Sequence, residues 1–152
     1  MTGRMRSPEV GERVMSNTEE IGYDEFPEAI RVVHAALLDP GRVEEAVPVA
    51  LQLLAHGWMS APARTEIARG WDRLGLEADL MVSMLFPDQM RYKLMVTAAP
   101  DDVTVLKAGQ QLALAAADGL DVLSVVAGLP DERRWALATA AADLRSSACR
   151  LG

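Results

Sequence analysis

The stretch LMVSMLFPDQMRYKLM, residues 80–95, decides how the whole chain is expected to fold. Its first half, from Leu80 to Phe86, places apolar residues on every side of a helix, and such a helix needs covering on all sides. Pro87 followed by Asp88 is typical of a new helix, because proline lacks the N–H that would go unpaired in the first turn. A helix that must be surrounded favours a closed bundle, while a short, irregular solenoid-like stack of helical hairpins is also compatible with the sequence.

The same punctuation by proline and glycine recurs along the chain. Openers such as FPEA, DPGR, APAR, FPDQ, APDD and LPDE place a proline beside a small or acidic residue, and an acid there suits the positive end of the helix dipole. Gly57, Gly75, Gly119 and Gly128 are interpreted as helix C-caps. No run of four residues alternates as a strand would, so we expect no sheet. The predicted fold class is all-α, a compact bundle of about seven to eight short helices in irregular hairpins, near residues 27–38, 42–56, 62–74, 77–86, 88–98, 101–117, 120–127 and 130–150.

Length and composition indicate one domain. A chain of 152 residues is long enough to bury its own core. Residues 1–24 are polar and lack periodicity, so we expect a flexible N-terminal tail followed by a single helical domain over 25–152. No apolar run resembles a secretory signal or a membrane span. The one cysteine, Cys149, cannot form an internal disulfide, so we expect a cytoplasmic protein.

The charge of the chain argues against one class of partner. Its net charge is −7, from 15 Lys and Arg against 22 Asp and Glu. No segment is net basic, whereas a protein that binds nucleic acid needs a concentrated positive surface for the phosphates. We therefore expect no nucleic-acid partner, and the absence of a long apolar run argues against a membrane partner.

Few residues suggest catalysis or metal binding. His34 is expected at the edge of the apolar face of its helix, and His56 at a helix carboxyl end, where a positive charge suits the dipole. The sequence has no His-x-x-x-His, Glu-x-x-His or Cys-x-x-Cys spacing and no glycine-rich phosphate loop, which are the patterns of metal and nucleotide sites. We therefore predict no catalytic, cofactor-binding or metal-ligating residue and no cofactor, and the sequence leans against an enzyme without deciding the matter.

The last predicted helix, 130–150, carries two apolar lines. The first is assigned to the core and consists of Leu137, Ala141, Leu144, Ala148 and Leu151. The second lies about half a turn away. Its small residues would let another helix approach closely, and its tryptophan would act as an anchor. This predicted interface consists of Trp135, Ala138, Ala142 and Cys149. The alternative is that the helix is central and both lines are internal.

Methionine suggests a different kind of site. Four of the eight methionines fall in residues 80–95, and methionine serves both irregular cores and adaptable binding surfaces. Met81 and Met84 are assigned to the core, because their helix has no polar face. A pocket between helices could also take an apolar small molecule. Its predicted lining consists of Trp71, Met81, Met84, Tyr92 and Met95.

Three functions are compatible with these observations. The preferred one is a non-enzymatic cytoplasmic interaction or regulatory module, an acidic helical bundle that forms a homodimer or other homo-oligomer, or docks on a protein partner. The alternative is a small-molecule-binding helical domain with an apolar pocket, acting as a sensor or an accessory enzyme. A weaker alternative is an acidic immunity protein or antitoxin that masks a basic target.

Overall fold

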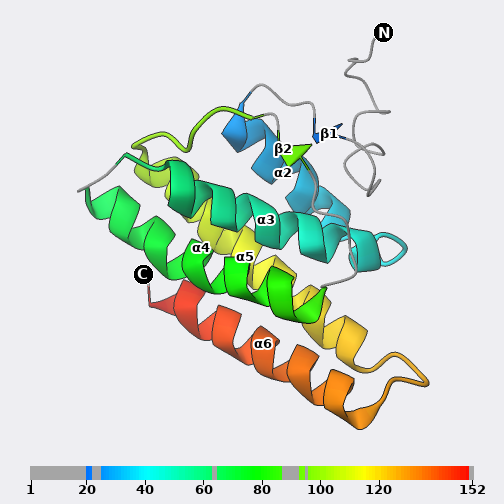
Figure 1. The fold of residues 1–152 in the computed structure, drawn as a ribbon. Coiled ribbons are helices and arrows are strands. Elements are labelled where there is room, and N and C mark those ends of the chain that lie inside the picture. Colours follow the sequence, from blue (N-terminus) through cyan, green and yellow to red (C-terminus); the bar gives the residue numbers. More distant parts are fainter. Residues whose placement is uncertain (1–19, 22–24, 63–64, 87–92, 95, 151–152) are drawn as a thin grey trace, which may run out of the picture.

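The computed structural model describes residues 20–21, 25–62, 65–86, 93–94 and 96–150. Within these ranges the chain forms five helices, which confirms the all-α fold class (Figure 1). They are α2 (Phe26–Leu37), α3 (Val43–Ser60), α4 (Glu66–Leu85), α5 (Val103–Ser124) and α6 (Asp131–Cys149). Two short strands, β1 (Glu20–Ile21) and β2 (Lys93–Leu94), pair in parallel. This ladder of two residues per strand was not predicted, and it adds no layer to the fold.

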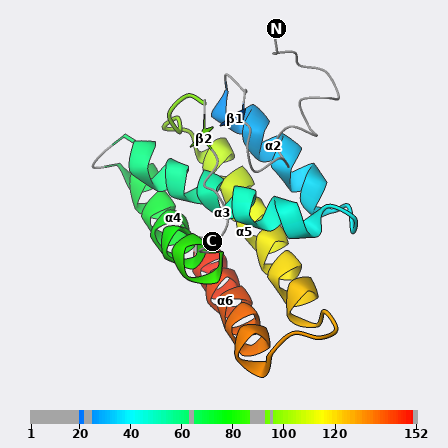
Figure 2. The same cartoon turned by 45° about the vertical axis from the view of Figure 1, so that its right-hand side comes forward.

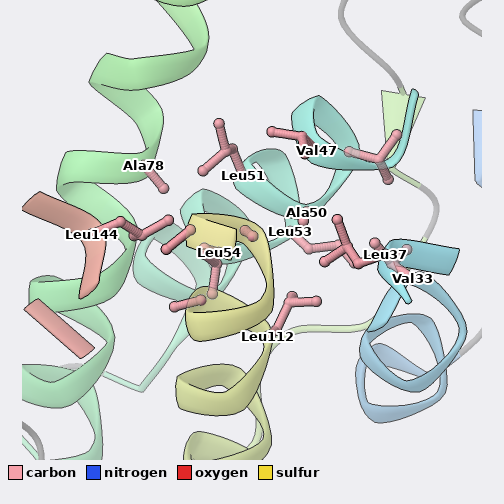
Figure 3. Close-up of a cluster of buried hydrophobic side chains, with 14 of the residues drawn as sticks. Val33, Leu37, Val47, Ala50, Leu51, Leu53, Leu54, Ala78, Leu112 and Leu144 are labelled. Atoms are coloured by element: carbon pink, nitrogen blue, oxygen red, sulfur yellow. The ribbon is translucent and has the colours of Figure 1, made fainter. Parts of the chain in front are cut away.

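Helix α3 forms the centre of the bundle. It packs on α2, α4 and α5, whereas α6 packs on α5 and α4 at the edge of the molecule farthest from α2 (Figure 2). Every residue of α3 from Ala46 to Ala55 is buried. Figure 3 shows side chains of α3 meeting those of the surrounding helices, with Val33 and Leu37 from α2 and Leu112 from α5.

The predicted centre of the bundle was wrong. Segments 77–86 and 120–127 were expected to be covered on every side, but each has an open side. The side chain of Met84 in α4 is 75% exposed, and that of Val122 in α5 is 53% exposed. The helical parts of both segments belong to α4 and α5, which pack on α3 with one face and reach solvent with another. Apolar residues around a helix therefore did not identify the helix that the others enclose.

The helices are also fewer and longer than predicted, in part because three glycines predicted as C-caps lie inside helices. Gly57, Gly75 and Gly119 do not end helices; they lie inside α3, α4 and α5. The predicted pair 62–74 and 77–86 is therefore one helix, α4, and the pair 101–117 and 120–127 corresponds to another, α5. These two mergers reduce the eight predicted segments to six, and the described residues of segment 88–98 form no helix, which leaves the five observed in the described ranges. Gly128, with φ of 86°, does adopt the left-handed conformation of a cap.

The interior glycines allow neighbouring helices to approach closely. A Cβ atom on Gly75 would lie 2.5 Å from the carbonyl oxygen of Leu54 in α3, and one on Gly119 would lie 2.7 Å from the Val47 side chain. Both distances are shorter than real Cβ contacts. Glycine is thus required at these positions by packing between helices rather than by backbone conformation.

Two other segments depart from their predictions or lie outside the described residues. Segment 88–98 was expected to be a helix, but Lys93–Leu94 form β2 and residues 96–98 are not helical; residues 88–92 and 95 lie outside the described ranges. Of the expected N-terminal tail, Glu20–Ile21 pair with β2, and residues 1–19 and 22–24 are not described. The division into a tail and one domain stays a prediction.

The first turn of α6 fixes that helix against two neighbours. Arg133 donates a hydrogen bond to the carbonyl of Leu85, the last residue of α4, and its guanidinium lies 5.4 Å from the ring centroid of Phe86. Arg134 donates to the carbonyl of Ser124, the last residue of α5, at 2.9 Å. Helix C-termini leave carbonyls without partners inside the helix, and these two arginines satisfy them. The contacts of its first turn therefore fix the position of α6 relative to α4 and α5.

Candidate functional site

Helix α6 has one buried face and one exposed face. Leu137, Ala141, Leu144 and Ala148 are buried, as predicted for the first apolar line, while Leu151 lies outside the described residues. The buried face packs against α4 and α5. Ser147, also on this face, donates a hydrogen bond of 2.5 Å to Glu77 of α4. These contacts determine which side of α6 is turned to solvent.

The second apolar line lies on that exposed side. Trp135 is 71% exposed, and Ala138, Ala142 and Cys149 are exposed as well. The alternative in which both lines are internal does not hold in this structure. An exposed tryptophan is notable because this residue is highly buried on average and enriched at binding hot spots. The structure brings the four predicted residues onto one open face, and their role as an interface stays a prediction.

Two charged residues share this face and were missed by the sequence analysis. Asp131 and Arg145 continue the spacing of the four predicted residues, so that steps of four and three alternate along the helix. Such spacing keeps side chains on one seam of a helix, as in coiled coils. We call the full set the outer row, and it consists of Asp131, Trp135, Ala138, Ala142, Arg145 and Cys149. The spacing alone could have revealed the two charges.

Arg145 is held in place by α5. Its Nη2 donates to Asp118 Oδ1 at 2.7 Å and to Asp121 Oδ2 at 2.8 Å. These hydrogen bonds, to Asp118 and then to Asp121, raise the pKa of Arg145 above its ordinary value. The side chain is still 37% exposed. It is thus a positioned cation at the edge of the outer row, on the side where α6 meets α5.

The residues predicted to line a pocket do not share one environment. Trp71 and Met81 are buried, whereas Met84 points to solvent, so the assignment of Met84 to the core was wrong. Tyr92 and Met95 lie outside the described residues. Met84 is exposed because it lies on the side of α4 away from α3. The described part of the set therefore divides between the core and the surface.

Trp71 is enclosed by one aromatic ring and by two neighbouring helices. Its ring centroid lies 5.3 Å from that of Phe26 in an edge-on arrangement. A Cβ atom on Gly109 would lie 2.5 Å from Trp71 Cη2, and one on Gly57 would also collide with the indole. Two helices thus approach the ring where only glycine fits. Its buried Nε1 has no hydrogen-bond partner among the described residues.

The two histidines lie on different helices, α2 and α3. His56 does not cap α3, which runs on to Ser60; its Nε2 instead lies 3.0 Å from the carbonyl oxygen of Thr97. His34 is half-buried on α2, consistent with the boundary position expected for it. In the ranges that the structure describes, no group of three His, Cys, Asp or Glu residues is placed to hold a metal ion. No described helix has the length and apolarity needed to cross a membrane.

Comparisons with protein-family models, with curated proteins and with solved structures give no match to this chain.

Proposed function

We propose that the protein is an interaction module that self-associates or docks on a protein partner through the outer row of α6. The observation that carries this proposal is the exposure of Trp135 on a helix whose opposite face is fully packed. Covering a large aromatic side chain of this kind on binding removes considerable apolar surface from water, and tryptophan loses little conformational freedom when it is fixed.

The surroundings of Trp135 support the same conclusion. Ala138 and Ala142 follow it on the exposed face, and their small side chains would let a partner approach the helix backbone. Arg145 adds an ordered charge at the far end of the row. The row thus combines an apolar part, formed by Trp135 and the two alanines, with charged groups towards its ends, and protein interfaces likewise surround an apolar core with a polar rim. A pocket function has less support, because the described candidates for its lining separate into core and surface.

Site-specific photo-crosslinking tests whether the row contacts a protein. A photoreactive amino acid replaces Ala142, at the centre of the row, in cells that produce the protein naturally. The matched control replaces Ala35, an exposed alanine of α2. We expect an adduct of defined mass from position 142, identified as a second copy or as one other protein, and none from position 35.

Specificity is checked in the same experiment with Trp135→Ala, which removes the anchor and should abolish the adduct. If positions 142 and 35 give the same products, or if the adduct persists without Trp135, the outer row is not an interaction surface and the proposal is wrong.

A further inference from the structure

Residues at equal distances from the two ends of the outer row are complementary to one another. Its residues fall in pairs equidistant from position 140 of α6. These pairs are Asp131 with Cys149, Trp135 with Arg145, and Ala138 with Ala142. Each pair joins residues that can lie against one another: small with small at the centre, and an aromatic ring with a cation further out. A row with this order can pack against a second copy of itself that runs in the antiparallel direction.

We infer that the partner of the outer row is a second copy of this chain, whose α6 packs antiparallel to the first about a two-fold axis near position 140. This inference rests on the proposed function and names its partner. In a two-fold contact the same patch is used by both subunits, so each pair of the row forms twice. Trp135 of each copy then faces Arg145 of the other.

Charge selects the antiparallel direction over the parallel one. A parallel pair of α6 helices would place Arg145 against Arg145 and Asp131 against Asp131, and like charges in contact are unfavourable. In the antiparallel pair, the guanidinium of Arg145 meets the indole of Trp135, an attractive cation–π arrangement. The acidic first turn, with Asp131 and Glu132, meets the basic end that carries Arg150.

The size of the side chains fits this geometry. Two packed helices lie about 8–10 Å apart depending on the side chains at the contact, and alanines at the crossing point favour the shorter spacing. Ala138 and Ala142 occupy that point and are exposed. Arg145 is already positioned by Asp118 and Asp121, so little of its conformational freedom remains to be lost on binding. The row is therefore prepared for close contact before a partner arrives.

Cysteine chemistry on the full-length chain tests this arrangement, because Cys149 is exposed and free. The variant Asp131→Cys places a second thiol opposite Cys149 of the other copy. Mild oxidation should then give a covalent dimer, with a yield at least fivefold above that of the wild type. In the wild type the two Cys149 Cα atoms would be about 27 Å apart, from 18 residues at about 1.5 Å each, whereas a disulfide needs about 4.4–6.8 Å.

Two controls accompany this variant. Ala35→Cys carries the same number of thiols on a different helix and should give no more covalent dimer than the wild type. Light scattering over a concentration series should show a wild-type dimer and a monomeric Ala138→Glu, since that substitution buries a carboxylate at each side of the crossing. The matched variant Ala35→Glu should remain dimeric.

A label on the native Cys149 needs no substitution and keeps the test decisive if a variant fails to fold. Pulsed electron resonance between two nitroxides should then report a separation near or above the 27 Å Cα distance. A separation close to the ~8–10 Å spacing of neighbouring helices, efficient cross-linking of the wild type, or a monomeric wild type would overturn the inference. If the wild type is monomeric but position 142 cross-links to another protein, the proposed function stands and only the identity of the partner is wrong.

Discussion

Two tryptophans of this chain lie beside small residues and have opposite environments. Trp71 in α4 is fully buried, and the small residues beside it, Gly57 and Gly109, belong to other helices that close on its ring. Trp135 in α6 is 71% exposed, and the small residues beside it, on its own helix, are exposed among the residues that the structure describes. The same combination of a large ring and small neighbours therefore completes the core in one region and leaves a surface open in the other.

The difference shows what small residues do in this fold. In the core they let the helices of this chain pack closely against one another. On α6 they would allow equally close packing of another helix, but no described part of the chain packs there. The region around Trp71 should therefore control the free energy of unfolding, and the region around Trp135 should control association.

The largest expected effect comes from removing the two rings in turn. Trp71→Ala should lower the free energy of unfolding by about 3–5 kcal/mol, because it leaves a cavity between α3, α4 and α5. Trp135→Ala should change it by less than about 0.5 kcal/mol for the isolated subunit, because the ring is open to water. Guanidinium unfolding followed by circular dichroism, at a concentration low enough to keep the chain monomeric, measures both. Equal losses would show that the two regions do not differ as described.

The second effect comes from adding one methyl group beside Trp71. Gly109→Ala should lower the free energy of unfolding by about 2 kcal/mol: overpacking costs up to about 3, and alanine returns about 1 as a better helix former. The matched control is Gly70→Ala in α4, where a Cβ would lie 2.6 Å from the flexible end of Leu106. That end can move aside, so the control should be neutral or stabilising in the same unfolding measurement. If Gly109→Ala leaves the free energy of unfolding unchanged, the packing around Trp71 has room for an extra methyl group.

These glycines also show why part of the fold could not be predicted from the sequence. A glycine that caps a helix and a glycine that admits a neighbouring helix look alike locally. Gly119 is set apart from Gly128 by Val47 of α3, a residue distant in sequence. The all-α class could be predicted, because helical periodicity is a local property. The helix count and the central position of α3 depend on which helices meet, and local patterns do not contain that information.

The candidate site was predicted in part for the same reason. Both faces of α6 follow from its own periodicity, and the structure places Trp135 and Leu137 on opposite faces as expected. Asp131 and Arg145 share the helical spacing of this face but are charged, so a pattern of apolar residues does not include them. Met84 was predicted in the core because apolar residues surround its helix, but such a pattern does not show which sides the other helices cover. Whether it is enclosed depends on α6 and α3, which cover other sides of α4.

The third effect tests the boundary between the two regions, which is the first turn of α6. Arg133→Met should lower the free energy of unfolding by about 1–2 kcal/mol, because the carbonyl of Leu85 loses a charged donor in a partly buried site. Arg150→Met, at the exposed other end, is the matched control and should change stability by less than about 0.5 kcal/mol. Thermal and guanidinium unfolding of both variants measure this. If the two variants behave alike, Arg133 does not fix α6 against α4.

The smallest expected effect on stability is that of substituting Arg145, and this variant best separates a role in folding from a role in association. Arg145 bridges Asp118 and Asp121 at positions that are largely exposed, and exposed ion pairs contribute about 0–1 kcal/mol and weaken in salt. Arg145→Met should therefore lower the free energy of unfolding by less than about 1 kcal/mol, and by less still at high ionic strength.

Association should respond differently, because in the antiparallel pair the same substitution removes two contacts with Trp135. A loss of dimer measured by light scattering, in a variant that unfolds almost as the wild type does, would place the role of Arg145 between subunits. Arg31→Met is the matched control, since Arg31 pairs with Glu28 on the exposed side of α2, and it should alter neither property appreciably. If Arg145→Met instead destabilises the monomer as much as Arg133→Met does, Arg145 belongs with the contacts that build the core. The open surface around Trp135 would then extend along the outer row only as far as Ala142, and Arg145 would belong to the folded core as the region around Trp71 does.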